Sequence, residues 1–280
     1  MTVLGAAYAG QAAETVRFHD EASDTTRLNQ LLSLPGIAEA RTPEALVELF
    51  GRQFIDTPYV AHTLECDSAE CLTVNLGQLD CTTFVETAMA LAYTGAEHRR
   101  SWRDFVYNLR RLRYRGGEVD GYASRLHYIA DWAADNRHRG NLVDVTESFP
   151  RVNTVTRTID FMSAHRDRYP ALADDEQYRR IRSVEDGYRN HRFPYIKTTD
   201  LASKATQAAF RSGDVIALVS NLKDLDVTHM GIVVKDAAGV PYLMHASSVD
   251  GKVEISDRPL AEVVKRNRNW IGVRVFRLKI

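Results

Sequence analysis

The chain lacks any run of about 18 apolar residues, so the sequence predicts no membrane-spanning helix. It also lacks a glycine-rich phosphate loop and a dinucleotide fingerprint, and we expect neither a cofactor nor a metal. The formal net charge of −1 argues against nonspecific nucleic-acid binding as the main role. No internal repeat or low-complexity linker divides the 280 residues, of which 44% are hydrophobic, so the chain can bury one large core.

Cysteine is scarce, with three residues in the chain. Cys66 and Cys71 are close enough to form a small disulfide loop in an oxidising compartment, which would leave Cys81 as the free thiol. In the alternative, all three are reduced. Residues 1–14 are mostly small and apolar and include an Ala-Tyr-Ala motif like a signal cleavage site, but no basic segment precedes it. We expect a trimmed signal or a disordered N-terminus, and a periplasmic or otherwise exported protein.

Cys81 stands where a turn leads into an apolar helix. Apolar residues recur with helical spacing over 84–92, Asp80 suits the N-cap position, and Gly95 suits the helix end. Cys81 therefore falls in the first turn, where unpaired N–H groups and the helix dipole favour an anion and lower a thiol pKa. The alternative is that Cys81 is a small buried side chain without a chemical role.

Two histidines lie near one end of an expected β-hairpin. A five-residue loop would set His229 and His245 directly opposite each other, whereas a four-residue loop without a bulge would put them on opposite faces. We expect them on the same face. The expected strands are 212–219, 229–235 and 240–247.

A nucleophile, a base and an orienting group are what covalent acyl transfer requires, and Cys81, His229 and His245 supply those residue types. Cys81 precedes His229 by a separation within the range of about 130–150 residues found in papain-like enzymes. Strand histidines are also often structural. A zinc metallohydrolase with the same three residues as ligands is a further alternative, although no short two-ligand spacing supports it.

These segments resemble the NlpC-type cysteine peptidases, papain-like enzymes that act on bacterial cell-wall peptides. The segments that carry this resemblance are 80–81 (DC), 213–215 (GDV), 229–233 (HMGIV) and 244–247 (MHAS). Four segments are similar to the N-acetylmuramoyl-L-alanine amidase-like branch: 57–60 (TPYV), 63–65 (TLE), 80–86 (DCTTFVE) and 124–128 (SRLHY). The match spans roughly residues 45–250. Thr82 stands where the superfamily usually has serine, and we interpret it as a feature of the branch.

The resemblance implies Cys81 as nucleophile, His229 as general base and acid, and His245 as the residue that orients His229. Tyr59 occupies the place of a tyrosine that lies near the oxyanion, although a Thr-Pro-Tyr segment could equally be a turn whose ring packs on the core. Further expected substrate contacts are Arg125, His127, Tyr128, Glu65 and Ser247.

One helix is expected over 124–137, which would place His127 and Asp131 one turn apart, so that Asp131 could fix the His127 tautomer. Arg125 presents a planar fork suited to a substrate carboxylate. A purely structural role for this polar and aromatic group is the alternative.

The expected fold class is α+β: a papain-like core in which an antiparallel sheet packs on the nucleophile helix, with a large helical insertion. We expect one enlarged catalytic domain over 15–280 with the insertion at about 101–210, lying over or beside the groove and determining specificity. A last strand is expected at 271–278.

The expected function is cell-wall hydrolysis of the amide between N-acetylmuramic acid and L-alanine, in peptidoglycan or muropeptides, through a cysteine thioester. The first alternative is an endopeptidase that cleaves after γ-D-glutamate in the stem peptide. The second is a catalytically silent wall-binding module that uses the same groove. Motif residues determine the reaction and loops determine the substrate, so sequence does not choose between the two bonds.

Overall fold

The computed structural model describes residues 16–65 and 69–280. The expected signal or disordered segment at 1–14 lies outside the described residues. So does Cys66, and with it the expected disulfide to Cys71.

The described chain alternates short helices and strands. The strands are β1 (Val16–Phe18), β2 (Leu72–Val74), β3 (Leu142–Asp144), β4 (Asn153–Arg157), β5 (His191–Lys197), β6 (Val215–Ser220), β7 (Val227–Lys235), β8 (Pro241–Ser247), β9 (Lys252–Pro259) and β10 (Trp270–Leu278). The helices are α1 (Glu21–Leu31), α2 (Gly36–Glu39), α3 (Pro43–Arg52), α4 (Cys81–Ala96), α5 (Trp102–Arg113), α6 (Ile129–His138), α7 (Phe161–Ala164), α8 (Asp175–Asp186), α9 (Lys204–Ala209) and α10 (Leu260–Arg266).

The expected antiparallel sheet is confirmed and is larger than the C-terminal hairpin. Its strand order is β4-β5-β10-β6-β7-β8-β9, β3 pairs with β10, and the pairings in this eight-stranded sheet are antiparallel. The fold is therefore mixed α+β, with one large antiparallel sheet. The sequence boundaries of β6, β7, β8 and β10 agree with the expected strands within two or three residues.

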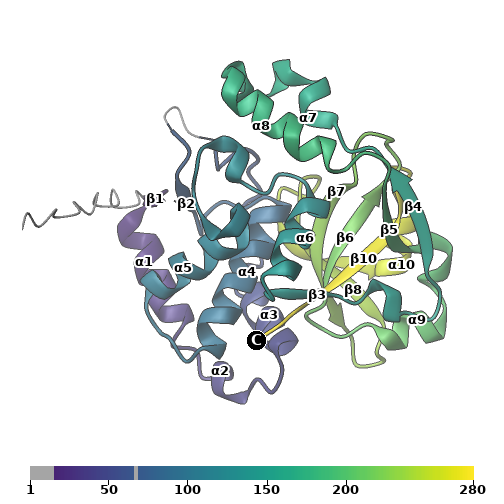
Figure 1. Cartoon of the computed structure of the whole chain (residues 1–280). Coiled ribbons are helices and arrows are strands. Elements are labelled where there is room, and N and C mark those ends of the chain that lie inside the picture. The colour runs from purple at the N-terminus through teal and green to yellow at the C-terminus, as the bar shows by residue number, and fades with distance from the viewer. Residues whose placement is uncertain (1–15, 66–68) are drawn as a thin grey trace, which may run out of the picture.

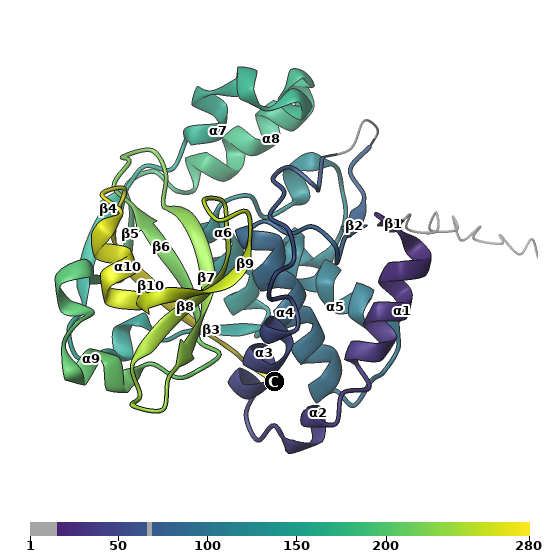
Figure 2. The ribbon, with the colours of Figure 1, turned by 180° about the vertical axis from the view of Figure 1, so that it is seen from behind.

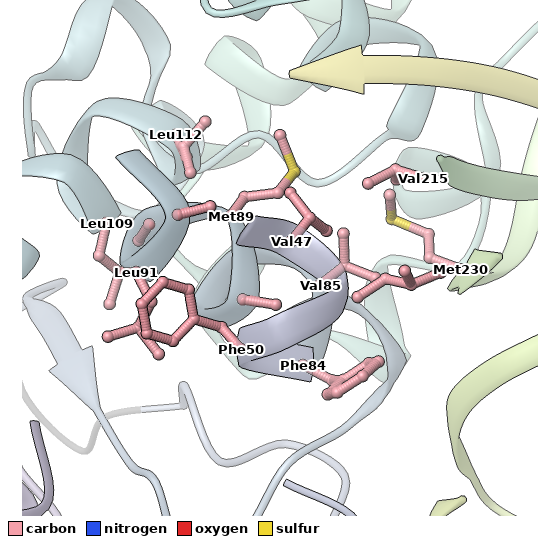
Figure 3. Close-up of a cluster of buried hydrophobic side chains, with 14 of the residues drawn as sticks. Val47, Phe50, Phe84, Val85, Met89, Leu91, Leu109, Leu112, Val215 and Met230 are labelled. Atoms are coloured by element: carbon pink, nitrogen blue, oxygen red, sulfur yellow. The ribbon is translucent and has the colours of Figure 1, made fainter. Parts of the chain in front are cut away.

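Helix α4 lies between the sheet and the other N-terminal helices, as Figures 1 and 2 show from opposite sides. Its side chains are buried from Thr83 to Gly95 because α3 and α5 cover the faces that the sheet does not. Figure 3 shows side chains of α3, α4 and α5 meeting those of β6 and β7, with Phe84 and Met230 among them. Truncating a fully buried phenylalanine such as Phe84 to alanine costs roughly 3–5 kcal/mol. This packing fixes the start of α4 against β7.

The segment 101–210 is not purely helical, which corrects the expected helical insertion. Helices α5 to α9 are present, but β3, β4 and β5 come from the same segment and extend the sheet. Strand β4 is NTVTR, in which Val155 is the one apolar residue, so its hydrophobic alternation is too weak to indicate a strand. The helix expected over 124–137 begins at Ile129, because Arg125 has extended backbone.

In the part of the chain that the structure describes, no helix is both long and apolar enough to cross a membrane.

Candidate active site

Cys81 is the first residue of α4, as the sequence predicts. Asp80 caps the helix: its Oδ1 accepts hydrogen bonds from the backbone N–H groups of Thr82 (3.0 Å) and Thr83 (2.8 Å). The Thr83 hydroxyl in turn accepts one from the Asp80 N–H, which completes a capping box. The half-buried thiol of Cys81 also interacts with the backbone of Met230, so the nucleophile candidate lies against β7 beside His229.

The thiol pKa differs from the sequence expectation. Burial, and then the nearby Asp80 carboxylate, raise the pKa of the Cys81 thiol to about 11, although hydrogen bonds to Met230 and Thr82 act in the opposite direction. The expected lowering at the helix N-terminus is therefore wrong for this thiol, because burial disfavours the thiolate and the Asp80 carboxylate that caps the helix adds a negative charge beside the sulfur. The resting thiol is protonated at neutral pH.

His229 and His245 form a direct pair. The Nε2 atom of His229 lies 2.8 Å from the Nδ1 atom of His245, and the two rings are nearly perpendicular. The expected shared face is confirmed. Ile232 pairs with Met244 in the β7–β8 register, so Gly231 rather than His229 is next in line to face His245, and the two histidines are diagonal neighbours.

Gly231 makes this diagonal contact feasible. A Cβ at this position would lie 2.5 Å from Leu243 Cδ1, 2.9 Å from the Met244 carbonyl oxygen and 3.2 Å from His245 Cβ. A side chain there would thus push β8 and the His245 ring away. A register shift against β6 between Leu218 and Val219 leaves a bulge just before His229, and bulges of this kind redirect neighbouring side chains.

Both imidazoles are neutral at pH 7. Burial, and secondarily His245, lower the pKa of His229 to about 3, and burial lowers the pKa of His245 to about 4. With one proton on each ring, one nitrogen of the 2.8 Å contact donates and the other accepts. Since Nε2 of His229 is engaged by His245, Nδ1 is the nitrogen left for chemistry.

Two acidic residues that the sequence did not single out flank His245. Glu254 pairs with His245 across β8 and β9, and its Oε1 lies 3.9 Å from His245 Nε2. Asp250, which accepts a 2.7 Å hydrogen bond from Ser247, acts to raise the pKa of His245. His229 therefore contacts His245, which in turn lies near the Glu254 carboxylate. Only the strand register could have identified Glu254, since nothing in its own segment marks it.

Tyr59 lies beside the thiol. Burial, then Cys81 and Asp80, raise the pKa of the Tyr59 hydroxyl. The backbone of this segment is held on two sides: the Tyr59 N–H donates to the Gly251 carbonyl (2.8 Å), and the Leu79 N–H donates to the Pro58 carbonyl (3.0 Å). Two separate segments therefore bring a phenol to the start of α4. Its ring also packs against the hydrophobic core.

A hollow of about 220 Å³, here called the charged hollow, opens next to Cys81. Asp80 and Thr82, which flank Cys81 in the sequence, line it. Its lining also includes Glu65, Arg125, His127 and Tyr169, which come from more distant segments. Tyr169 comes from the loop that precedes α8, so the segment 101–210 lies beside the site, as expected.

Comparison with known proteins gives the family. The AmiA-like family model, described as N-acetylmuramoyl-L-alanine amidase-like, matches residues 49–273. The chain belongs to the AmiA-like family. A crystal structure of an N-acetylmuramoyl-L-alanine amidase from Bacteroides uniformis is 38% identical, with a TM-score of 0.80 over 85% of this chain and 99% of that one. No curated protein matches the chain.

Two further structures resemble this AmiA-like protein. A Bacteroides fragilis protein, provisionally named a xylanase, is 37% identical with a TM-score of 0.76, over 83% of this chain and 100% of that one. A Legionella pneumophila protein is 19% identical with a TM-score of 0.71, over 93% and 96% of the two chains, and shows a shared fold. The AmiA-like family comprises amidase-type hydrolases of the cell wall, and its substrate is peptidoglycan.

Arg125 lines the charged hollow, where acidic side chains already pair with it. The guanidinium is 7% exposed and is already paired with Glu65 (3.0 Å) and Glu70 (3.5 Å). A substrate carboxylate would have to displace Glu65, whose side chain is 42% exposed. The freely accessible charge at this point is thus the carboxylate of Glu65.

The expected contact between His127 and Asp131 is absent. His127 Nε2 lies 2.9 Å from the Tyr122 carbonyl oxygen, and burial lowers the pKa of His127 to about 3. Asp131 instead accepts hydrogen bonds from Arg115 and Tyr188. The prediction was wrong because His127 precedes the helix that holds Asp131.

Two other residues that we expected to contact the substrate are buried, and their hydroxyl groups have partners within the protein. Tyr128 is buried in a separate cluster, where its hydroxyl donates to Glu185 (2.7 Å) and accepts from the Met162 N–H (2.7 Å). Ser247 is 2% exposed and its hydroxyl is engaged by Asp250. Among the described residues, no group of three His, Cys, Asp or Glu side chains is placed to hold a metal ion.

Proposed function

We propose that this AmiA-like protein hydrolyses the amide between N-acetylmuramic acid and L-alanine, in peptidoglycan or muropeptides, through a thioester on Cys81. The observation that carries the proposal is the meeting of the Cys81 thiol with β7 beside the directly paired His229 and His245. The family membership supports the bond. An antiparallel sheet packed on the helix that begins at the nucleophile supports assignment to the papain-like NlpC-type superfamily.

The first half of the reaction forms the thioester. The sulfur of Cys81 forms a bond to the muramoyl carbonyl carbon as its proton passes to Nδ1 of His229. The Cys81 backbone N–H, at the open end of α4, and the Tyr59 hydroxyl donate to the oxyanion. The C–N bond then breaks as His229 returns the proton to the L-alanine nitrogen.

The second half releases the sugar acid. Water attacks the thioester carbonyl while His229 takes its proton, the C–S bond breaks, and the thiol is regenerated. Because the resting thiol is protonated, proton transfer and attack on the carbonyl proceed together. His245 holds the His229 ring by the 2.8 Å contact, and Glu254 lies on the side where positive charge develops. The exported location inferred from the N-terminal sequence fits a wall substrate.

Mass analysis of products from N-acetylmuramoyl-L-alanyl-D-isoglutamine tests the proposal. We expect free N-acetylmuramic acid and an intact dipeptide, and a Cys81→Ala variant without turnover. Cys71→Ala is the matched control, because Cys71 lies just before β2 and does not line the charged hollow. A longer muropeptide that loses part of its stem while the sugar bond stays intact would support the endopeptidase instead.

Thiol alkylation and chelation separate this proposal from a zinc hydrolase. We expect iodoacetamide to abolish turnover in parallel with modification of Cys81, and a chelator to leave it unchanged. Loss of activity in chelator, restored by added zinc, would contradict the thioester mechanism.

A further inference from the structure

A second hollow, here called the polar hollow, borders the histidine side of the site. Its volume is about 410 Å³, within the range of about 300–1,000 Å³ typical of small-molecule sites. Its lining includes His229, Leu222, Thr228, Asn267, Asn269 and Trp270. His229 lines the polar hollow, whereas Asp80 and Thr82, on either side of Cys81, line the charged hollow. The Cys81 thiol interacts with the backbone of Met230, the residue after His229, so the two hollows lie on either side of the candidate site.

We propose that the polar hollow binds the N-acetylated sugar ring of the substrate, and that the charged hollow receives the peptide. This inference rests on the proposed function, and it assigns the sugar and the peptide of the substrate to different hollows. Among the described residues that line the polar hollow, none is Asp, Glu, Lys or Arg. The charged hollow is lined by carboxylates and guanidinium groups, including Glu65, Asp80 and Arg125. An N-acetylated sugar is uncharged once its lactyl carboxyl is an amide, whereas a stem peptide carries carboxylates.

Trp270 supplies an apolar platform at the polar hollow. Its ring stacks on His229 with centroids 5.7 Å apart and an interplanar angle of 21°. The indole N–H donates to the Thr228 hydroxyl at 3.0 Å, which fixes the orientation of the ring. The C–H face of a pyranose packs well on an indole, and this aromatic group already touches the proposed base.

Two side-chain amides provide the polar contacts. Asn267 Oδ1 accepts a hydrogen bond from the Asn269 backbone N–H at 2.9 Å, and the Asn267 amino group takes no part in this bond. The Asn269 side-chain amide makes no hydrogen bond within the described part of the chain, and the residue is exposed. Amide groups that both donate and accept suit sugar hydroxyls and an N-acetyl group. At the Asn269 amide, a ligand would compete with water rather than with an internal partner.

Calorimetric titration of the Cys81→Ala protein tests the assignment without turnover. The ligands are N-acetylmuramoyl-L-alanine and the sugar-free L-alanyl-D-isoglutamine. In this background, Asn269→Ala should weaken binding of the sugar-bearing ligand by up to about tenfold, the range for one hydrogen bond, and leave the peptide unaffected. The backbone carbonyl of residue 269, which accepts from Asn221, is retained. Asn153→Ala, on β4 outside the hollow, is the matched control.

A second variant guards against an indirect effect on His229. Trp270→Phe keeps a ring over the imidazole and removes the indole N–H, so sugar affinity should fall less than in Trp270→Ala. Unchanged sugar binding in Asn269→Ala and Trp270→Ala, or an equal loss for the peptide, would overturn the assignment. Turnover that survives in Cys81→Ala would instead contradict the proposed function, while the binding result would still identify the sugar site.

Discussion

His229 Nε2 and His245 Nδ1 lie 2.8 Å apart although neither histidine is opposite the other in the β7–β8 register. The contact is diagonal across the hairpin, and it leaves only Nδ1 of His229 for proton transfer. In the proposed mechanism, His245 holds the His229 ring in one orientation and tautomer.

Loss of His245 should therefore reduce kcat more than it affects KM. In His245→Ala, the His229 ring loses its 2.8 Å partner, and we expect kcat to fall by about 10²-fold, at the lower end of the range for acid–base residues. His229→Ala, which removes the base, should lower kcat by about 10³–10⁴-fold. His138→Ala, at the end of α6, is the control in steady-state kinetics. A change in KM with kcat unaltered in His245→Ala would contradict an orienting role.

Alkylation of Cys81 should report the raised thiol pKa. Because the thiolate is the reactive form and its pKa is about 11, the rate of modification by iodoacetamide should rise about tenfold per pH unit between pH 7 and 10. Peptide mass mapping separates Cys81 from the other cysteines. A rate that is already maximal at pH 7 would instead indicate a preformed thiolate and imidazolium pair.

Stability should fall on the acid side because both histidines are buried in the neutral form. Their pKa values are lowered from an ordinary value of about 6.5 to about 3 and about 4, so the unfolded chain binds more protons than the folded one over this interval. The contribution of neutral His229 and His245 to the free energy of unfolding is complete above about pH 6.5. It is lost as the pH falls from there to about 3. Urea unfolding of the wild type and of His245→Gln at several pH values measures it. The variant should show a shallower decline, and parallel curves would contradict the prediction.

Gly231→Ala should damage both stability and activity. The added Cβ would meet Leu243 Cδ1 and the Met244 carbonyl oxygen at less than 3 Å, and the backbone atom cannot yield without moving β8. We expect a loss of roughly 1–3 kcal/mol in unfolding free energy, together with lower kcat as His245 shifts. Gly77→Ala is the matched control, since its Cβ would meet only Asn75 Oδ1 at 3.8 Å. Equal melting temperatures for the two variants would argue against the close approach.

The location of Cys81 followed from local physics and was predictable. The Asp80 cap and the apolar spacing of α4 depend on neighbours within a few residues, so the sequence indicates them directly. The C-terminal strands were predictable for the same reason, since their apolar runs are long and bounded by turns. Strand periodicity alone left the shared face of the histidines open, because it also depends on the hairpin register.

Only the tertiary structure decided the electrostatics of these groups and their partners. The Cys81 pKa depends on burial by distant segments and on the balance between the helix end and the Asp80 carboxylate, which the sequence does not quantify. The partners of Arg125 and His127, which are Glu65, Glu70 and the Tyr122 carbonyl, are set by loop packing that the sequence does not indicate.

The sequence by itself determined a cysteine at a helix start, histidines in two neighbouring strands, and an α+β fold with an antiparallel sheet. Tertiary structure decided the diagonal histidine contact, the two acidic residues beside His245 and the two hollows next to the candidate site. The physical reason is the sequence separation over which each effect acts, since capping and periodicity depend on residues a few positions apart. Register, bulges and burial depend instead on segments such as β9 and Trp270 that meet the site only after folding.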